Sequence, residues 1–190
     1  MKRFILFLSL IISVSLVSGS AWAQELKKPK FILLIAEQNI ESPQKGWWAS
    51  EVDLSATEVV IARKIIETGW EVLEPEQIED VVKKNKAFRV LDLSEKDSIK
   101  LGNLSQADYV VLGKAIASAG GSVPQSTMRS CFANLSAKLI RVKDRKVIAY
   151  LDAAGSSAHL DIISGGREAL SSAAAILAPK IIEAVNKQGY

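Results

Sequence analysis

Two long strand-like runs near the carboxyl end place the strongest constraint on the fold. Residues 129–142 read RSCFANLSAKLIRV, residues 146–160 read KVIAYLDAAGSSAHL, and a short charged turn, KDRK, joins them. Two strand segments separated by a turn of this length are typical of an antiparallel hairpin. The sequence therefore predicts a long antiparallel hairpin in the carboxyl-terminal part of the chain.

Three further strand segments precede this hairpin. KFILLIAEQNI (30–40) is almost continuously apolar, the pattern of a strand covered on both faces. WEVLE (70–74) and ADYVVLGKAIASA (107–119) are the other two. Helical segments separate them, and right-handed crossovers make strands connected in this way parallel neighbours.

Three helices are expected between these strands. The first opens at the S-x-x-E capping box of Ser55 and Glu58 and stops at Gly69. Pro75 stands at the first position of the second, and Ser94 begins the third.

A fourth, Ala-rich helix is expected from Gly165 to Lys187, with Ser164 as its cap and Pro179 kinking or splitting it. The predicted fold is a single α/β (α+β) domain. It has a mixed sheet of about five strands, a long carboxyl-terminal antiparallel hairpin and helices packed on the sheet.

The first 23 residues have the features of a signal peptide. Lys2 and Arg3 precede an apolar run over residues 4–17, and AWA ends at Ala23, where we expect cleavage. The run is shorter than a membrane-spanning helix, and no cysteine near the junction would accept a lipid. We therefore expect residues 24–190 to form one periplasmic domain that is neither a lipoprotein nor an integral membrane protein.

Composition excludes several classes of function. The chain has 24 basic and 21 acidic residues, and removal of Lys2 and Arg3 leaves 24 − 2 = 22 basic ones, so no nucleic-acid partner is expected. Cys131 is the only cysteine and His159 the only histidine, which gives no metal site and no intramolecular disulfide. No cofactor motif is present either.

The segment SSAHLDIISGGREAL raises the question of a catalytic triad. On a strand, Ser157, His159 and Asp161 would share a face about 6 to 7 Å apart, too far for a nucleophile–base hydrogen bond. We expect this segment to mark the passage from a strand to a helix, with no catalytic residues. Cys131 is expected to be a small buried hydrophobe rather than a reactive thiol.

Two segments are candidates for partner binding. Trp47 and Trp48 are adjacent in KGWW, and two explanations stay open: an exposed indole that contacts a partner or a sugar, or two indoles packed against the sheet edge. The weaker candidate is the loop GGSVPQSTM (120–128), whose expected contacts are Ser122, Gln125 and Met128.

Four segments together resemble a group of bacterial envelope proteins: GWEVLEPEQIEDVV, ADYVVLGKAIAS, ANLSAKLIRVKDRKVIAY and GGREALSSAAAILAPKIIEAV. They are similar to flagellar assembly protein T, to the curli-secretion lipoprotein CsgG, to the amino-terminal domain of TolB and to outer-membrane activators of penicillin-binding proteins. The resemblance covers about residues 30–187 and implies a non-catalytic domain that assembles rings or docks onto envelope machines.

From these features we expect a non-enzymatic, exported assembly module with a protein partner, flagellar or at the outer membrane. The alternatives are a peptidoglycan-binding or penicillin-binding-protein-activator-like protein and, less favoured, a small hydrolase using Ser157 or Cys131 with His159. Homo-oligomers are a further expectation, because an open sheet has edge strands that need cover or pairing.

Overall fold

The computed structural model describes residues 28–49, 55–85, 88, 91 and 93–189, so the leader expected at residues 1–23 lies outside the described part. A sheet of five strands runs in the order β2-β1-β3-β4-β5. The strands are β1 (Lys30–Gln38), β2 (Glu71–Val72), β3 (Tyr109–Ser122), β4 (Arg129–Arg141) and β5 (Lys146–His159). β1 is parallel to β2 and β3, whereas β3–β4 and β4–β5 are antiparallel, which confirms the predicted mixed sheet with its long hairpin.

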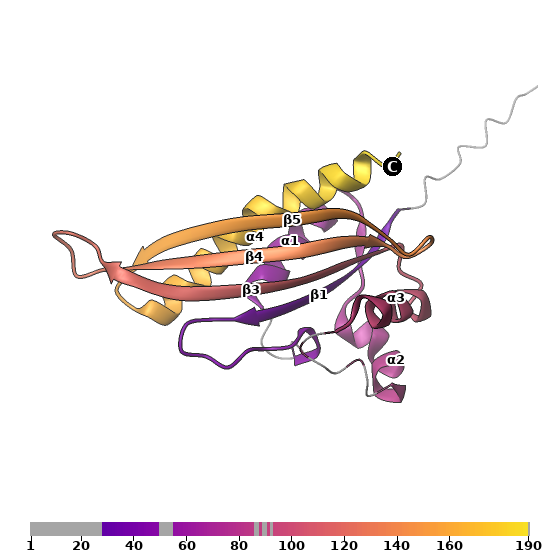
Figure 1. Ribbon diagram of the computed structural model, residues 1–190, viewed down its shortest axis with the longest axis horizontal. Helices are drawn as coiled ribbons and strands as arrows, with labels where there is room; N and C mark the ends of the chain where they lie inside the picture. Colours follow the sequence, from indigo (N-terminus) through magenta and orange to yellow (C-terminus); the bar gives the residue numbers. More distant parts are fainter. Residues whose placement is uncertain (1–27, 50–54, 86–87, 89–90, 92, 190) are drawn as a thin grey trace, which may run out of the picture.

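Helices cover the two faces of the sheet unequally (Figure 1). On one face lie α1 (Ala56–Glu67) and α4 (Ile162–Asn186), and α4 follows the long strands β3, β4 and β5. On the other face, α2 (Glu79–Lys84) and α3 (Glu95–Leu104) gather at the end where β1 and β3 begin. Two short 3₁₀ helices, η1 (Trp47–Ala49) and η2 (Pro75–Ile78), accompany them.

Each face of β1 contributes to a different hydrophobic core. Phe31 packs under α1 and α4, where its ring stacks on Tyr109 with centroids 5.2 Å apart. Ile32 and Leu34 point to the opposite side and join a second core with Val110. Successive side chains of a strand alternate between faces, so a strand buried on both sides must be apolar at nearly every position.

The predicted residues cap the first and third helices, α1 and α3. Ser55 Oγ accepts the N–H of Glu58 at 3.1 Å, and Ser94 Oγ accepts the N–H of Asp97 at 3.1 Å. A further capping contact was not predicted: the carboxylate of Glu37 accepts the N–H of Thr57 at 2.8 Å and its hydroxyl at 2.7 Å. This contact fixes the end of β1 to the start of α1.

The start and continuity of α4 differ from the prediction. Asp161, not Ser164, is the cap: its carboxylate accepts the Ser164 N–H at 2.8 Å, and the helix begins at Ile162. The helix also continues through Pro179 without being split. Pro179 and Ala175 lie on the exposed side, where water can bind the carbonyl that proline leaves without an N–H partner.

Candidate functional site

One face of the β3–β4–β5 ribbon is left uncovered by α4. Alternation along β4 sends Cys131 and Leu135 under α4, with 0% and 1% exposure, and turns Phe132 outward with 47%. We call this outward surface the ribbon face. Four cross-strand pairs define it: Ile116 with Asn134, Phe132 with Ser156, Ser136 with Asp152, and Lys138 with Tyr150.

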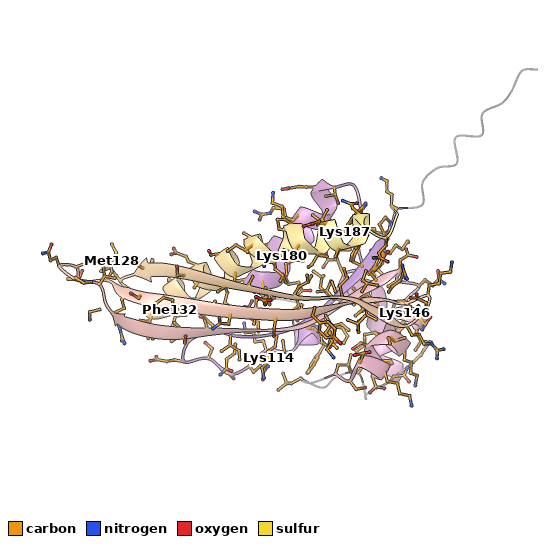
Figure 2. The ribbon with its side chains drawn as sticks, turned by 45° about the horizontal axis from the view of Figure 1, so that its top comes forward. Lys114, Met128, Phe132, Lys146, Lys180 and Lys187 are labelled. Atoms are coloured by element: carbon orange, nitrogen blue, oxygen red, sulfur yellow. The ribbon has the colours of Figure 1, made fainter. Side chains whose placement is uncertain are left out.

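Aromatic and aliphatic side chains stand out on the ribbon face. Tyr150 is 73% exposed and Ile116 is 40% exposed. The ring of Phe132 lies over Gly120 of the neighbouring strand, where an added Cβ would come within 2.5 Å of Cε2. Figure 2 shows Phe132 on the ribbon between Met128 and the helical end of the molecule. The apolar groups are therefore displayed on a hydrogen-bonded sheet rather than on a loop.

Lys138 links the ribbon face to α3. Its Nζ lies 3.1 Å from Oε2 of Glu95 and 5.5 Å from the ring centroid of Tyr150. Beside it is a depression of about 430 Å³, lined by Leu93 and Leu112 among others. A depression of this volume with an apolar floor and a few polar groups can receive one or two side chains of a partner.

The predicted loop residues form the far tip of this ribbon. β3 extends to Ser122, so Gly120, Gly121 and Ser122 belong to the strand and the turn covers only residues 123–128. Ser122, Gln125 and Met128 are all exposed there. The Val123 N–H donates to the Met128 carbonyl at 2.9 Å, which closes the turn. The structure brings these three residues together and next to the ribbon face.

The predicted tryptophans lie elsewhere and are packed. Trp47 is 4% exposed within the second core, and its ring meets that of Trp48 edge to face, with centroids 5.9 Å apart. Trp48 is half-buried, and its ring occupies the space that a Cβ on Gly46 would fill. Of the two explanations left open, packing describes the structure. A contact between the Trp47–Trp48 pair and a partner stays a prediction.

The residues of the considered triad each serve the β5–α4 connection. Ser157 Oγ donates to the Gly165 carbonyl at 2.6 Å. His159 Nδ1 accepts the Asp161 N–H at 3.0 Å, while the Asp161 carboxylate caps α4. Cys131 is fully buried, with Sγ 3.7 Å from the Ile162 carbonyl oxygen. These contacts place the segment at the strand-to-helix passage, as predicted.

Among the described residues, no cluster of three or more His, Cys, Asp or Glu side chains is arranged to hold a metal ion. No helix in that part of the chain combines the length and apolarity needed to cross a membrane.

Comparison with known proteins gives similarity at the level of solved structures. No protein-family model matches the chain, and no curated protein matches it significantly. Lipoprotein GNA1162 from Neisseria meningitidis is 18% identical, with 84% of this chain and 97% of that chain covered and a TM-score of 0.42. Protein CT253 from Chlamydia trachomatis is 11% identical, with coverages of 83% and 95% and a TM-score of 0.44. The carboxyl-terminal domain of LpoB from Salmonella enterica is 12% identical, with coverages of 66% and 81% and a TM-score of 0.39.

The expected resemblance to bacterial envelope proteins stays a prediction, because these solved structures have TM-scores below 0.5. Flagellar assembly protein T, CsgG and TolB are not among these three structures, so that finer resemblance stays a prediction. At such identities and TM-scores, the role of the chain has to be argued from its own residues.

The ribbon face was missed because its residues were treated only as parts of strands. A signal for it was present in the sequence. In the hairpin, Phe132 and Tyr150 occupy positions that alternate with the core-facing ones, where polar residues are expected if a face is solvated.

Proposed function

We propose that this chain is a non-enzymatic, exported binding or assembly module of the bacterial cell envelope, and that the ribbon face contacts its protein partner. One observation carries the proposal. Ile116, Phe132 and Tyr150 are all exposed along the part of the sheet face that no helix of the described chain covers. Exposed apolar groups gathered on one surface are typical of interaction sites.

The surroundings of these side chains support a docking role. Small and polar residues such as Ser136 and Ser156 lie next to them, so a partner can approach the aromatic rings closely. Binding hot spots are usually aromatic anchors surrounded by contacts that keep water away from them in the complex. Asp152 adds an exposed negative charge that would orient the partner.

The contacts of the single histidine favour a non-enzymatic role over the small hydrolase. A hydrolase would need the imidazole to reach a nucleophile. Here Nδ1 binds the Asp161 backbone, and the Ser157 hydroxyl is engaged by the Gly165 carbonyl. If the hydrolase alternative were correct, His159→Ala would abolish an activity while the fold stayed intact.

A photo-crosslinking amino acid at Phe132 or Tyr150, introduced in living cells, tests the proposal. We expect both positions to yield the same discrete protein adduct. The matched control is Ile176, a 46% exposed apolar residue of α4, which should not yield it. Products shared with position 176, or none from the ribbon face, would count against the proposal.

Binding to the crosslinked partner should weaken about tenfold or more in Phe132→Ala, as expected for an aromatic anchor, and little in Ile176→Ala. The identity of the partner then decides between flagellar, outer-membrane and penicillin-binding-protein-activator roles. Sedimentation with purified peptidoglycan and no protein adduct would favour the glycan-binding alternative.

A further inference from the structure

A second surface lies on α3, at the end of the molecule opposite the Met128 tip. It is a groove of about 670 Å³, and we call it the α3 groove. Lys146, at the start of β5, marks the same end in Figure 2. The residues of the groove that carry the argument are Lys96, Ile99, Lys100, Leu104 and Arg145.

The floor of the α3 groove is apolar and its rim is cationic. Ile99 is 9% exposed, while Leu104 at the end of the helix is 49% exposed. Lys96, Lys100 and Leu104 recur every four residues and therefore lie along one side of α3. Arg145, from the turn between β4 and β5, adds a third positive charge.

The nearby carboxylates are already engaged elsewhere. Glu95 also lines the groove, but its carboxylate lies 3.1 Å from Lys138 Nζ on the ribbon face. Asp144, next to Arg145 in the chain, is held by Arg141 through two hydrogen bonds of 3.0 and 2.7 Å. Among the described residues, no carboxylate forms an ion pair with the three cations of the rim.

We infer that the α3 groove docks a short acidic helix of a partner protein. Its Asp or Glu side chains would face Lys96, Lys100 and Arg145, and its apolar side chains would pack on Ile99 and Leu104. From Lys96 to Leu104 the helix rises about 12 Å, just over two turns. A partner helix lying along it would place residues four apart opposite the two lysines.

The apolar floor is short, and this favours a peptide over a lipid. Two aliphatic side chains match one or two apolar residues of a partner, whereas an acyl chain would need a longer apolar channel. The inference does not depend on the ribbon face, which displays aromatic groups on the sheet. Substitution of Phe132 should leave binding at the α3 groove unchanged, so failure of either proposal can be recognised separately.

Selection of twelve-residue peptides from a random display library on the immobilised protein tests this inference. We expect enriched peptides with an excess of Asp and Glu and with apolar residues at helical spacing. At low salt, the affinity of an enriched peptide should fall about fivefold in Lys96→Glu, as for the loss of an exposed charge pair. High salt should weaken binding to the wild type and reduce this difference, because it screens exposed charges. Leu104→Ser should lower it by a similar factor.

Two substitutions on α1 are matched controls, Arg63→Glu for the charge and Ile66→Ser for the exposed aliphatic side chain. Both residues are exposed, and Ile66 is 54% accessible. We expect peptide affinity to stay within about twofold of the wild type in both.

Arg145→Asn removes the third charge of the α3 groove and should also weaken binding. Residue 145 has a φ of 59°, a left-handed conformation that asparagine tolerates.

Three outcomes would overturn the inference: enriched peptides without an acidic excess, equal binding by Lys96→Glu, or equal losses in the α1 controls. Phosphatidylglycerol vesicles are tested beside the peptides, to find out whether the α3 groove binds an anionic lipid. Binding of these vesicles that is lost in Lys96→Glu, with no enriched acidic peptide, would make the groove a lipid site instead.

Discussion

At the scale of single residues, α4 packs closely on the sheet because glycines at the contact carry no side chain. A Cβ on Gly155 of β5 would overlap the Ala169 carbonyl oxygen and the Ala173 nitrogen of α4. A Cβ on Gly165 would lie 2.6 Å from Cys131 Sγ. The Ala-rich composition of α4 has the same effect, because small side chains let the helix backbone approach the strands. A side chain added at Gly155 could not be accommodated by a change of rotamer, because the atoms it would meet belong to the backbone of α4.

Gly155→Ala should therefore destabilise the protein. The added methyl must displace the backbone of α4, and overpacking of this kind typically costs about 1–3 kcal/mol. Urea unfolding followed by circular dichroism measures the change in unfolding free energy. Gly121→Ala is the control, since a Cβ there meets nothing within 4 Å, and it should stay within about 0.5 kcal/mol. Equal stabilities of the two variants would contradict the assigned packing.

At the scale of elements, helix starts were predicted well where a serine precedes the helix and less well at α4. Ser164 was the expected cap and Gly165 the expected first residue, but both lie inside the helix. Asp161, which was not a predicted cap, caps α4 instead. Both residues are good caps in isolation. The choice depends on where β5 leaves β4, and that position is set by tertiary pairing.

The acid stability of the protein should depend in part on the Asp161 cap. Hydrogen bonds from Ser164 lower the pKa of Asp161 in the folded protein. The folded state then binds fewer protons than the unfolded one, so the stabilisation is complete above the ordinary Asp pKa of about 3.9 and is lost as the pH falls through the lower folded value. In Asp161→Asn, which keeps a capping oxygen, the fall in Tm on acidification should be smaller than in the wild type.

Thermal unfolding at several pH values between about 6 and 3 measures this difference. Asp152→Asn, an exposed aspartate of β5 that caps no helix, serves as the control and should keep the wild-type slope. A slope in Asp161→Asn equal to that of the wild type would show that the cap makes no contribution.

At the scale of the whole molecule, the two predicted binding segments lie in regions with different packing. Trp47 belongs to the second core at the end where α2 and α3 cover the sheet. The tip around Met128 extends past that core and is 41% exposed at Met128 itself. Between them, the ribbon is covered by α4 on one face only. The molecule thus has a body with two cores and an extended ribbon with one.

This division predicts opposite effects of substitution at the two segments. Trp47→Ala should lower the unfolding free energy by about 3–5 kcal/mol, because it empties a buried position, whereas Met128→Ala should change it by less than about 0.5 kcal/mol. Chemical unfolding measures both. If Trp47→Ala were as stable as the wild type, the indole would not be part of the core, and a direct role in partner binding would become the better explanation.

The sequence by itself determined most of the elements, the parallel relation of the first strands and the antiparallel hairpin of the last two. Periodicity, capping residues and short connections are local signals, and the order of parallel crossovers and a hairpin then leaves few ways to build one sheet. Tertiary structure alone decided which side of the hairpin is covered, since each strand alternates regardless of which face meets a helix. It likewise decided the burial of Trp47 and the position of Arg145 beside Lys96 and Lys100 of α3. These depend on segments that are distant in the chain and become neighbours only when the sheet and its helices have packed.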